Sequence, residues 1–357
     1  MDSTKNNRRN FLKNAVIGTV GLSSFSLLSS CSSFDDYLFE DRYNFNDEVM
    51  IVGGGISGLY LAHKLRINKT EFRLFEGANS FGGRIKSLNG ADFGASLLSA
   101  NDKLAKGLVN ELALQTKALD KDYFYLNDGM QSMPDVLLER IIGLIPYRNF
   151  RLRWKLVSIQ KFSAGFELIF ENPNGQKRFN CKKIALAIPP GQWSSVSGLL
   201  ELPEMHWASD WLKTLKVENT IKLVLPNSAL PSGAKPLVEV VYEDLHIRQI
   251  IKKNRAAPFV EIDVKYLSNR EVSIDYIYDS LKKKLQLNYP FQKLSSDQFY
   301  DWHEVKLIKG SGFRNYMAIP ESINNNFQIV GDFTANKTLY TIEGALQSAT
   351  LASELLL

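Results

Sequence analysis

The chain has 357 residues, 45% of them hydrophobic, with a formal net charge of +5, two cysteines and four histidines. This length can bury one large core or two smaller ones. The first thirty residues contribute +3 of the charge and leave +2 for the remainder, which argues against a nucleic-acid partner. Two cysteines build no disulfide framework, and the scattered histidines lack the paired spacing of a zinc site, so we expect no metal.

The beginning of the chain indicates an export signal. Arg8 and Arg9 open a twin-arginine pattern, followed by a mildly apolar run too short to span a bilayer. The run ends at Cys31 in a sequence that resembles a lipoprotein signal-peptidase box, although an ordinary buried helix with a chance cysteine would look similar. We expect a signal peptide over 1–30 read by the twin-arginine translocase, a lipidated Cys31 that anchors a periplasmic protein to the membrane, and a polar tether over 31–46.

The folded part is expected to begin at Glu48 with a strand, a glycine turn and a helix. A short apolar run over 49–52 precedes the glycines, and an apolar helical pattern follows them. In such a unit one glycine permits the tight turn, one lets the backbone approach a diphosphate and one lets helix and strand pack closely. The candidate cofactor-binding residues of this turn are Gly53, Gly55, Ile56, Ser57 and Gly58.

A second strand, over 72–75, ends in Glu76 at the distance expected for a ribose-binding carboxylate. A carboxylate there binds ribose hydroxyls and repels a 2′-phosphate, so it favours an adenosine with free hydroxyls over NADP. A glycine-rich turn in an unrelated α/β protein is the alternative interpretation.

The residues after Glu76 carry a family resemblance. Paired Gly82 and Gly83 are followed by Arg84, and the segment resembles the flavin-containing amine oxidase superfamily, which includes monoamine, polyamine and L-amino-acid oxidases and more distant desaturases. The resemblance implies that the glycines contact FAD and that Arg84 places a guanidinium beside its diphosphate. It also implies an α/β fold with a Rossmann-type FAD-binding domain and a discontinuous α+β substrate domain, reduced because the chain is short for the superfamily.

The resemblance continues along the chain in the order of the family. Gly94, Ala95 and Ser96 resemble a small-residue segment that passes near the flavin ring, and an amphipathic helix is expected from Asp135. Strands are then expected over 156–159, 166–170 and 183–188, with a turn at 173–175. The resemblance implies that the backbone of Val157 contacts adenine, which is compatible with a plain strand valine.

The candidate catalytic residue lies on a later strand, expected over 220–225. A helix is expected over 272–287. Lys222 in this strand matches the family lysine that holds a water near flavin N5. A solvent-facing lysine on an alternating strand is the other interpretation.

The C-terminal segment resembles the flavin-closing motif of the family. A strand over 327–330 leads into Gly331 and Asp332, and a helix follows. The resemblance implies that Asp332 accepts hydrogen bonds from the ribityl chain. It also implies that the helix start stabilises negative charge at flavin N1 and C2=O, through Ile342, Glu343 and Gly344. No cysteine lies near this motif, so FAD is expected to bind noncovalently.

The motifs divide the chain into two discontinuous domains. The FAD-binding domain is expected over 47–100, 151–200 and 305–357, and the substrate domain over 101–150 and 201–304.

One departure from the family limits the functional prediction. Thr341 stands where amine oxidases commonly carry an aromatic wall, Tyr340 is one residue early, and Trp302 is equally well explained as a core residue. The resemblance implies an FAD-dependent oxidoreductase that transfers hydride from a small molecule, an amine, to flavin N5, with O2 or a quinone as acceptor. The alternatives are a desaturase or isomerase acting on an apolar substrate, and a non-catalytic flavin-binding protein.

Overall fold

The computed structural model describes part of the chain, and the fold is derived from that part. No helix there is long and apolar enough to cross a membrane. The predicted signal peptide, Cys31, Trp302 and Tyr340 lie outside it. The described residues are 46–88, 91–143, 149–213, 220–226, 237–241, 245–253, 259–266, 274–286, 299–301, 325–334, 338 and 341–357.

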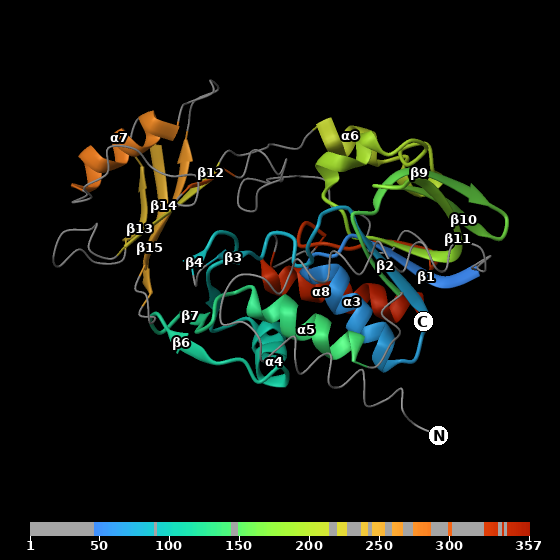
Figure 1. Ribbon diagram of the computed structural model, residues 1–357, viewed down its shortest axis with the longest axis horizontal. Coiled ribbons are helices and arrows are strands. Elements are labelled where there is room, and N and C mark those ends of the chain that lie inside the picture. Colours follow the sequence, from blue (N-terminus) through green and yellow to red (C-terminus); the bar gives the residue numbers. More distant parts are fainter. Residues whose placement is uncertain are drawn as a thin grey trace.

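A parallel sheet forms the centre of the larger body (Figure 1). Its neighbouring strands all pair in parallel, in the order β8 (Phe150–Leu152), β2 (Phe72–Glu76), β1 (Asn46–Val52), β11 (Gly175–Leu186) and β17 (Phe327–Ile329). A strand buried on both faces has a continuous apolar run, as 49–52 does in β1. The predicted α/β fold with a Rossmann-type parallel sheet is confirmed.

An antiparallel hairpin extends this sheet beyond β11. Strands β9 (Lys155–Phe162) and β10 (Gly165–Asn172) pair with each other, and β10 pairs with the first half of β11. The predicted turn lies between β10 and β11, where the N–H of Asn174 donates to the side-chain oxygen of Asn172 at 2.8 Å.

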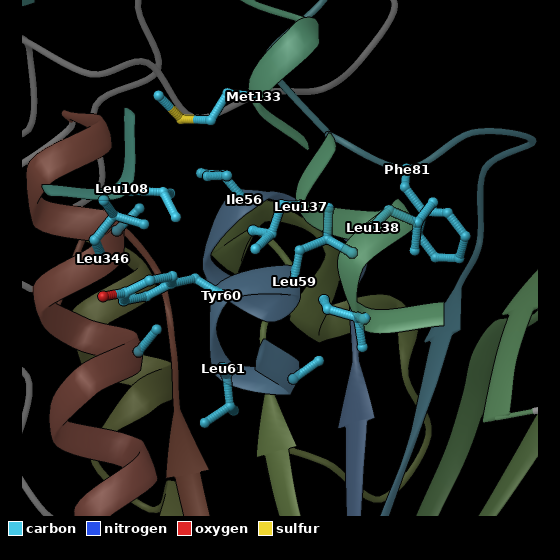
Figure 2. Packing of buried hydrophobic residues seen from close by; sticks show 14 of the residues in the cluster. Ile56, Leu59, Tyr60, Leu61, Phe81, Leu108, Met133, Leu137, Leu138 and Leu346 are labelled. Atoms are coloured by element: carbon cyan, nitrogen blue, oxygen red, sulfur yellow. The ribbon is translucent and has the colours of Figure 1, made fainter. Parts of the chain in front are cut away.

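Four helices share one core on one face of the sheet. They are α3 (Ile56–Ile67), α4 (Lys103–Glu111), α5 (Ser132–Ile142) and α8 (Ile342–Leu356). Figure 2 shows Leu59 of α3 beside Leu137 of α5, and Tyr60 turned towards α8. Nine of the twelve residues of α3 are buried, including the polar Ser57 and His63, and the basic Lys64 and Arg66 lie in its last turn.

Helix α5 begins three residues earlier than predicted from Asp135. Pro134 lies in its first turn, where an N–H would have no intrahelical partner, so the proline does not prevent the earlier start. Helices α4 and α5 belong to the segment 101–150, which was predicted as part of the substrate domain, yet they pack in the core of the Rossmann sheet. The division of the chain into two domains stays a prediction.

The opposite face of the sheet is covered by aromatic side chains. Phe75 stacks on Phe170 at 4.1 Å between ring centroids, and Trp193 stacks on Trp211 at 5.7 Å. Both tryptophans belong to the segment after β11, which forms η2 (Pro190–Ser195), η3 (Pro203–Met205) and α6 (Ala208–Lys213). Met50 and Val52 of β1 point into this aromatic core, whereas Val49 and Ile51 point into the core shared by the helices.

A second, antiparallel sheet stands apart from the first in Figure 1, with α7 (Ile274–Leu285) beside it. Its order is β13 (Leu237–Val241), β14 (Leu245–Lys253), β15 (Phe259–Tyr266), β12 (Thr220–Pro226) and β16 (Phe299–Asp301).

Short strands accompany the two larger sheets, and β3 and β4 lie between these sheets in Figure 1. Ala91 and Phe93, in and after β4, pack on Val224 of β12 and so connect the two parts of the molecule. The short strands are β3 (Ser87–Leu88), β4 (Ala91–Asp92), β5 (Leu98–Ser99), β6 (Thr116–Ala118) and β7 (Tyr123–Leu126).

The contact between β1 and α3 gives a prediction for stability. A Cβ at Gly58 would lie 2.0 Å from the carbonyl oxygen of Gly53, so Gly58→Ala must move helix or strand. We expect a loss of about 1–3 kcal/mol in the free energy of unfolding, measured by denaturant titration. The control is Gly107→Ala in the exposed interior of α4, where a Cβ meets no atom within 4 Å and should stabilise by about 0.5–1 kcal/mol. Equal stability of Gly58→Ala and the unmutated protein would contradict the close approach.

Candidate functional site

The first glycine turn leads from β1 directly into α3. Gly53 has a φ of +113°, and its N–H donates to the carbonyl of Phe75 at 2.7 Å. Gly55 is the N-cap of α3 and leaves the first amides of the helix without a capping side chain. A Cβ on Gly55 would meet no atom within 4 Å, so open space adjoins the helix start. Ile56, Ser57 and Gly58 form the first turn of α3, as predicted.

Glu76 at the end of β2 is bound to this turn. One carboxylate oxygen accepts from the N–H of Gly54 at 2.6 Å, and the other accepts from the N–H of Ala78 at 2.7 Å. Burial raises the pKa of the Glu76 carboxyl, and hydrogen bonds from the backbone of Ala78, Gly54 and Gly77 act in the opposite direction. The predicted ribose-binding residue therefore lies beside the glycine turn, with its orientation fixed by the backbone.

The second pair of glycines lies directly against the first turn. The N–H of Gly82 donates to the carbonyl of Gly54 at 2.9 Å, and Gly82 forms an isolated parallel bridge with Gly55. Gly82 and Gly83 both have positive φ angles, +105° and +60°, which favour glycine. Two motifs that are separate in the sequence thus form one continuous backbone surface at the start of α3.

Arg84 and Asp332 form an ion pair between the guanidinium Nη2 and the carboxylate Oδ1. Asp332 is buried, whereas a third of the Arg84 side chain is exposed. The N–H of the preceding Gly331 donates to the Ser348 hydroxyl at 3.0 Å, which ties the segment after β17 to α8. The residues predicted at the diphosphate and at the ribityl chain therefore meet at one place.

Lys222 reaches from the second sheet to the predicted small-residue segment. Its Nζ donates to the carbonyl oxygen of Gly94 at 2.7 Å and to the hydroxyl of Ser96. The lysine is 2% exposed, so the interpretation as a solvent-facing lysine is wrong. The N–H of Ala95 donates to the carbonyl of Arg84 at 3.2 Å, which joins this segment to the second glycine turn.

Thr341, which stands at the position of the aromatic wall in amine oxidases, directly precedes helix α8. Thr341 is its N-cap, and the threonine Oγ1 accepts from the N–H of Gly344 at 3.0 Å. The amides of Ile342 and Glu343 precede the first intrahelical hydrogen bond, as at the start of any α-helix. A threonine at this position therefore has a structural role as a helix cap.

The side chain of Glu343 points away from the start of its own helix. Its carboxylate accepts from the backbone N–H groups of Leu104 at 3.1 Å and Ala105 at 2.9 Å, in the first turn of α4. The Glu343 side chain thus joins the start of α8 to the start of α4. Only the backbone of Glu343 remains at the N-terminus of α8.

Val157 lies at an irregularity of β9. The pairing with β10 shifts there, with Ser158 opposite Ile169 and Leu156 opposite Phe170, so Val157 is the extra residue of a β-bulge. Its carbonyl accepts from the N–H of Ser197 at 2.9 Å. A bulge changes the direction of the local backbone. The backbone contact with adenine that the resemblance implied for Val157 is compatible with this irregular position.

Sequence reasoning missed two buried carboxylates near Lys222. Asp92 and Glu261 are 0% and 1% exposed, and the N–H of Asp92 donates to Glu261 Oε1 at 3.0 Å. Glu261 lies on a strand in which charged and apolar residues alternate, a pattern that does not indicate a buried carboxylate, and Asp92 lies 169 residues away in the sequence.

Together these features define a mixed α/β protein with a Rossmann-type nucleotide-binding domain and an antiparallel second sheet. Comparison with known proteins agrees: the family described as NAD(P)-binding Rossmann-like domain matches residues 51–112. The chain is also similar in structure to the cyclohexylamine oxidase from Brevibacterium oxydans, with a TM-score of 0.65, 12% identity and coverage of 87% of this chain and 99% of that chain. A putrescine oxidase bound to putrescine gives a TM-score of 0.61, 13% identity and coverage of 87% and 98%. The chain has the fold of these amine oxidases.

Asp135 in the first turn of α5 generates a pH prediction. Its pKa is raised to about 6, mainly by burial, opposed by a hydrogen bond from Gln131 and aided by the charge of Glu139. A carboxyl whose pKa is higher in the folded protein stabilises the fold at low pH, and this stabilisation is lost as the pH rises from about 4 to about 6.

We expect the unfolding free energy of the unmutated protein to fall across that window relative to Asp135→Asn, by on the order of 2–3 kcal/mol. Denaturant unfolding of both proteins at pH 4, 5, 6 and 7 measures the difference. A constant difference across this range would show that Asp135 does not titrate as assigned.

Proposed function

We propose that the protein is an FAD-dependent oxidoreductase that binds its cofactor noncovalently and takes hydride from a small amine. The observation that carries the proposal beyond nucleotide binding is the position of Lys222. It comes from a separate sheet, is buried, and contacts Gly94 and Ser96, in the segment that adjoins the two glycine turns. The fold shared with amine oxidases supports the same conclusion.

The start of α3 fits a diphosphate. Its first amides have no capping side chain, and the space beside Gly55 is open. Backbone N–H groups and the helix dipole favour an anion at such a position. Glu76 would bind the ribose hydroxyls of the adenosine, and the bulged backbone at Val157 would contact the adenine.

Two charged side chains would hold the middle of the cofactor. Arg84 is partly exposed and would bind the diphosphate, while Asp332 would accept hydrogen bonds from the ribityl hydroxyls. Their ion pair keeps both side chains in place and offsets the burial of the Asp332 carboxylate. The N–H groups of Ile342 and Glu343, at the start of α8, would stabilise negative charge at the pyrimidine end of the ring system, while the N–H of Gly344 donates to the Thr341 cap.

When bound, FAD supplies the electron-accepting centre for hydride from the C–H next to nitrogen. Lys222 would hold a water close to that centre through its Nζ, and the carbonyl of Gly94 and the hydroxyl of Ser96 fix the direction of the ammonium group. A small acceptor, O2 or a quinone, would complete the turnover.

Thr341 favours a second candidate, a desaturase or isomerase that acts on an apolar substrate. As an exposed helix cap, this residue provides no aromatic wall for an amine. A non-catalytic flavin protein is the third candidate. Only the amine oxidase interpretation requires reduction by amines, so that reaction separates the three.

We also propose that the protein is exported by the twin-arginine translocase and anchored in the periplasm through a lipid on Cys31. The order of twin arginines, apolar run and cysteine supports this proposal. Fractionation of cells that express the unmutated protein or Cys31→Ser tests it. Membrane-bound unmutated protein and released variant are expected, and an identical distribution of the two proteins would contradict the anchor.

The open space at Gly55 gives a prediction for FAD binding. Gly55 has φ −68° and ψ 178°, which alanine adopts readily, so Gly55→Ala should fold with unchanged stability. The added methyl group would keep the diphosphate from the amides of α3. We expect the affinity for FAD to fall about 10- to 100-fold, as for loss of a charge-assisted hydrogen bond.

Visible absorbance after reconstitution measures the affinity, and heat release of FAD into the supernatant tests noncovalent binding. Gly107→Ala is the matched control and should bind FAD like the unmutated protein. An unchanged affinity of Gly55→Ala for FAD would show that the diphosphate does not bind at this turn. An unmutated protein that binds no FAD would overturn the proposed function.

The amine reaction gives a separate prediction. We expect bleaching of the flavin absorbance when primary amines and diamines are mixed anaerobically with the FAD-loaded protein. Lys222→Met should bind FAD but bleach at least about tenfold more slowly, because the group that holds the water is lost. Bleaching by no amine in a panel of aliphatic, cyclic and aromatic compounds would exclude the amine oxidase interpretation and leave the desaturase and the non-catalytic protein.

A further inference from the structure

Three charged side chains are buried together where the second sheet meets the Rossmann domain. Asp92, Lys222 and Glu261 are 0%, 2% and 1% exposed. An unpaired charge at such depth would be strongly destabilising, so each needs nearby hydrogen-bond or charge partners. The arrangement of the three is therefore informative about what each of them does.

Glu261 lies diagonally across from Lys222 on two paired strands, and Asp263 is the residue directly opposite the lysine. Glu261 of β15 lies opposite Val224 of β12, which comes two residues after Lys222. The side chains of Glu261, Val224 and Lys222 therefore share one face of the sheet. Glu261 Oε2 is 3.9 Å from Lys222 Nζ. At this distance the carboxylate stabilises the positive charge of the lysine without occupying the short contacts, which go to Gly94 and Ser96.

The other oxygen of Glu261 binds the segment on which the lysine acts. Oε1 accepts from the N–H of Asp92 at 3.0 Å, and Asp92 precedes Gly94 by two residues. The Asp92 carboxylate binds in a different direction, because its Oδ1 accepts from the N–H of Met130 at 2.8 Å and from the hydroxyl of Ser87 at 2.5 Å. Glu261 of β15 thus contacts both the lysine of β12 and the backbone of the 92–96 segment.

We propose that Glu261 is a positioning residue for Lys222. One carboxylate oxygen fixes β15 to the backbone that leads to Gly94, and the other holds the lysine charge in the direction of Gly94 and Ser96. The reactive position of Lys222 therefore depends on a glutamate of a neighbouring strand. This inference rests on the proposed function of Lys222 at the flavin.

The test compares Glu261→Gln with Lys222→Met and with the double variant. Glutamine keeps an oxygen that can accept from Asp92 but removes the charge that faces Lys222. We expect Glu261→Gln to bind FAD normally and to lower the limiting rate of flavin reduction about tenfold, with little change in KM, which corresponds to about 1.4 kcal/mol. Because Glu261 acts through the lysine, Glu261→Gln should have no further effect on that rate in the Lys222→Met background. Independent, multiplicative effects on the rate would overturn the proposal.

Glu204→Gln is the matched control. Glu204 is also a buried glutamate, 5% exposed and ion-paired with Lys161, but it belongs to η3 on the aromatic face of the Rossmann sheet. Its substitution should lower stability and leave the rate of flavin reduction unchanged. Glu261→Asp keeps the charge and serves as a second variant if glutamine prevents folding. The rate of flavin reduction by Glu261→Asp should be higher than that of Glu261→Gln. If Glu261→Gln cannot be isolated, the rate of Glu261→Asp should lie within a few-fold of that of the unmutated protein. A slower rate in either comparison would overturn the proposal.

Unfolding without added FAD distinguishes failure of this inference from failure of the proposed function. The four proteins of the Lys222 and Glu261 cycle should show non-additive unfolding free energies, because either single change leaves one charge buried without its partner. Additive values would overturn the contact between the two side chains. Non-additive values in a protein that binds no FAD would support the contact and reject the flavin role of Lys222.

Discussion

The close approach of backbone to backbone between β1 and α3 is the constraint on which the site depends. Glycine at Gly53 and Gly58 lets the helix begin immediately at the end of the central strand. The first amides of α3 then point beyond the edge of the sheet, and the second glycine turn fits against them through the Gly82 N–H. Larger side chains at these positions would separate helix and strand. The remaining site segments are arranged around this one geometry.

The second constraint is electrostatic, because the two parts of the molecule meet over buried charges as well as apolar contacts. Ala91, Phe93 and Val224 make a small apolar contact, and beside it Lys222 and Glu261 are nearly inaccessible to water. Removing charges from water is unfavourable unless hydrogen bonds and opposite charges replace the solvent. Such an interface tolerates few relative positions of its parts. It therefore specifies where the lysine lies more strictly than apolar packing would.

The sequence predicted those parts of the fold whose signals are local. The apolar run of β1, the glycine turn and the acid at Glu76 specify a strand, a turn and a strand end within thirty residues, and they agree with the Rossmann-type α/β fold that the family resemblance implied. The partner of Lys222 was not predictable, because Glu261 lies on another strand and no local pattern states which strands pair. The partners of the Glu343 side chain have no local signal either, since its acceptor role depends on where α4 packs.

The first turn of α8 meets two requirements: one of its first amides is capped, and the positive end of the helix is kept clear of a carboxylate. The first amides of a helix need partners, and Thr341 provides one of them through its hydroxyl, which an aromatic side chain at the same position would not do. The carboxylate of Glu343 turns away to the start of α4, so it does not place a negative charge in front of its own helix. The positive end of α8 therefore stays available to an anionic group. A substrate pocket in this protein must then obtain its shape from side chains other than the one at the helix cap.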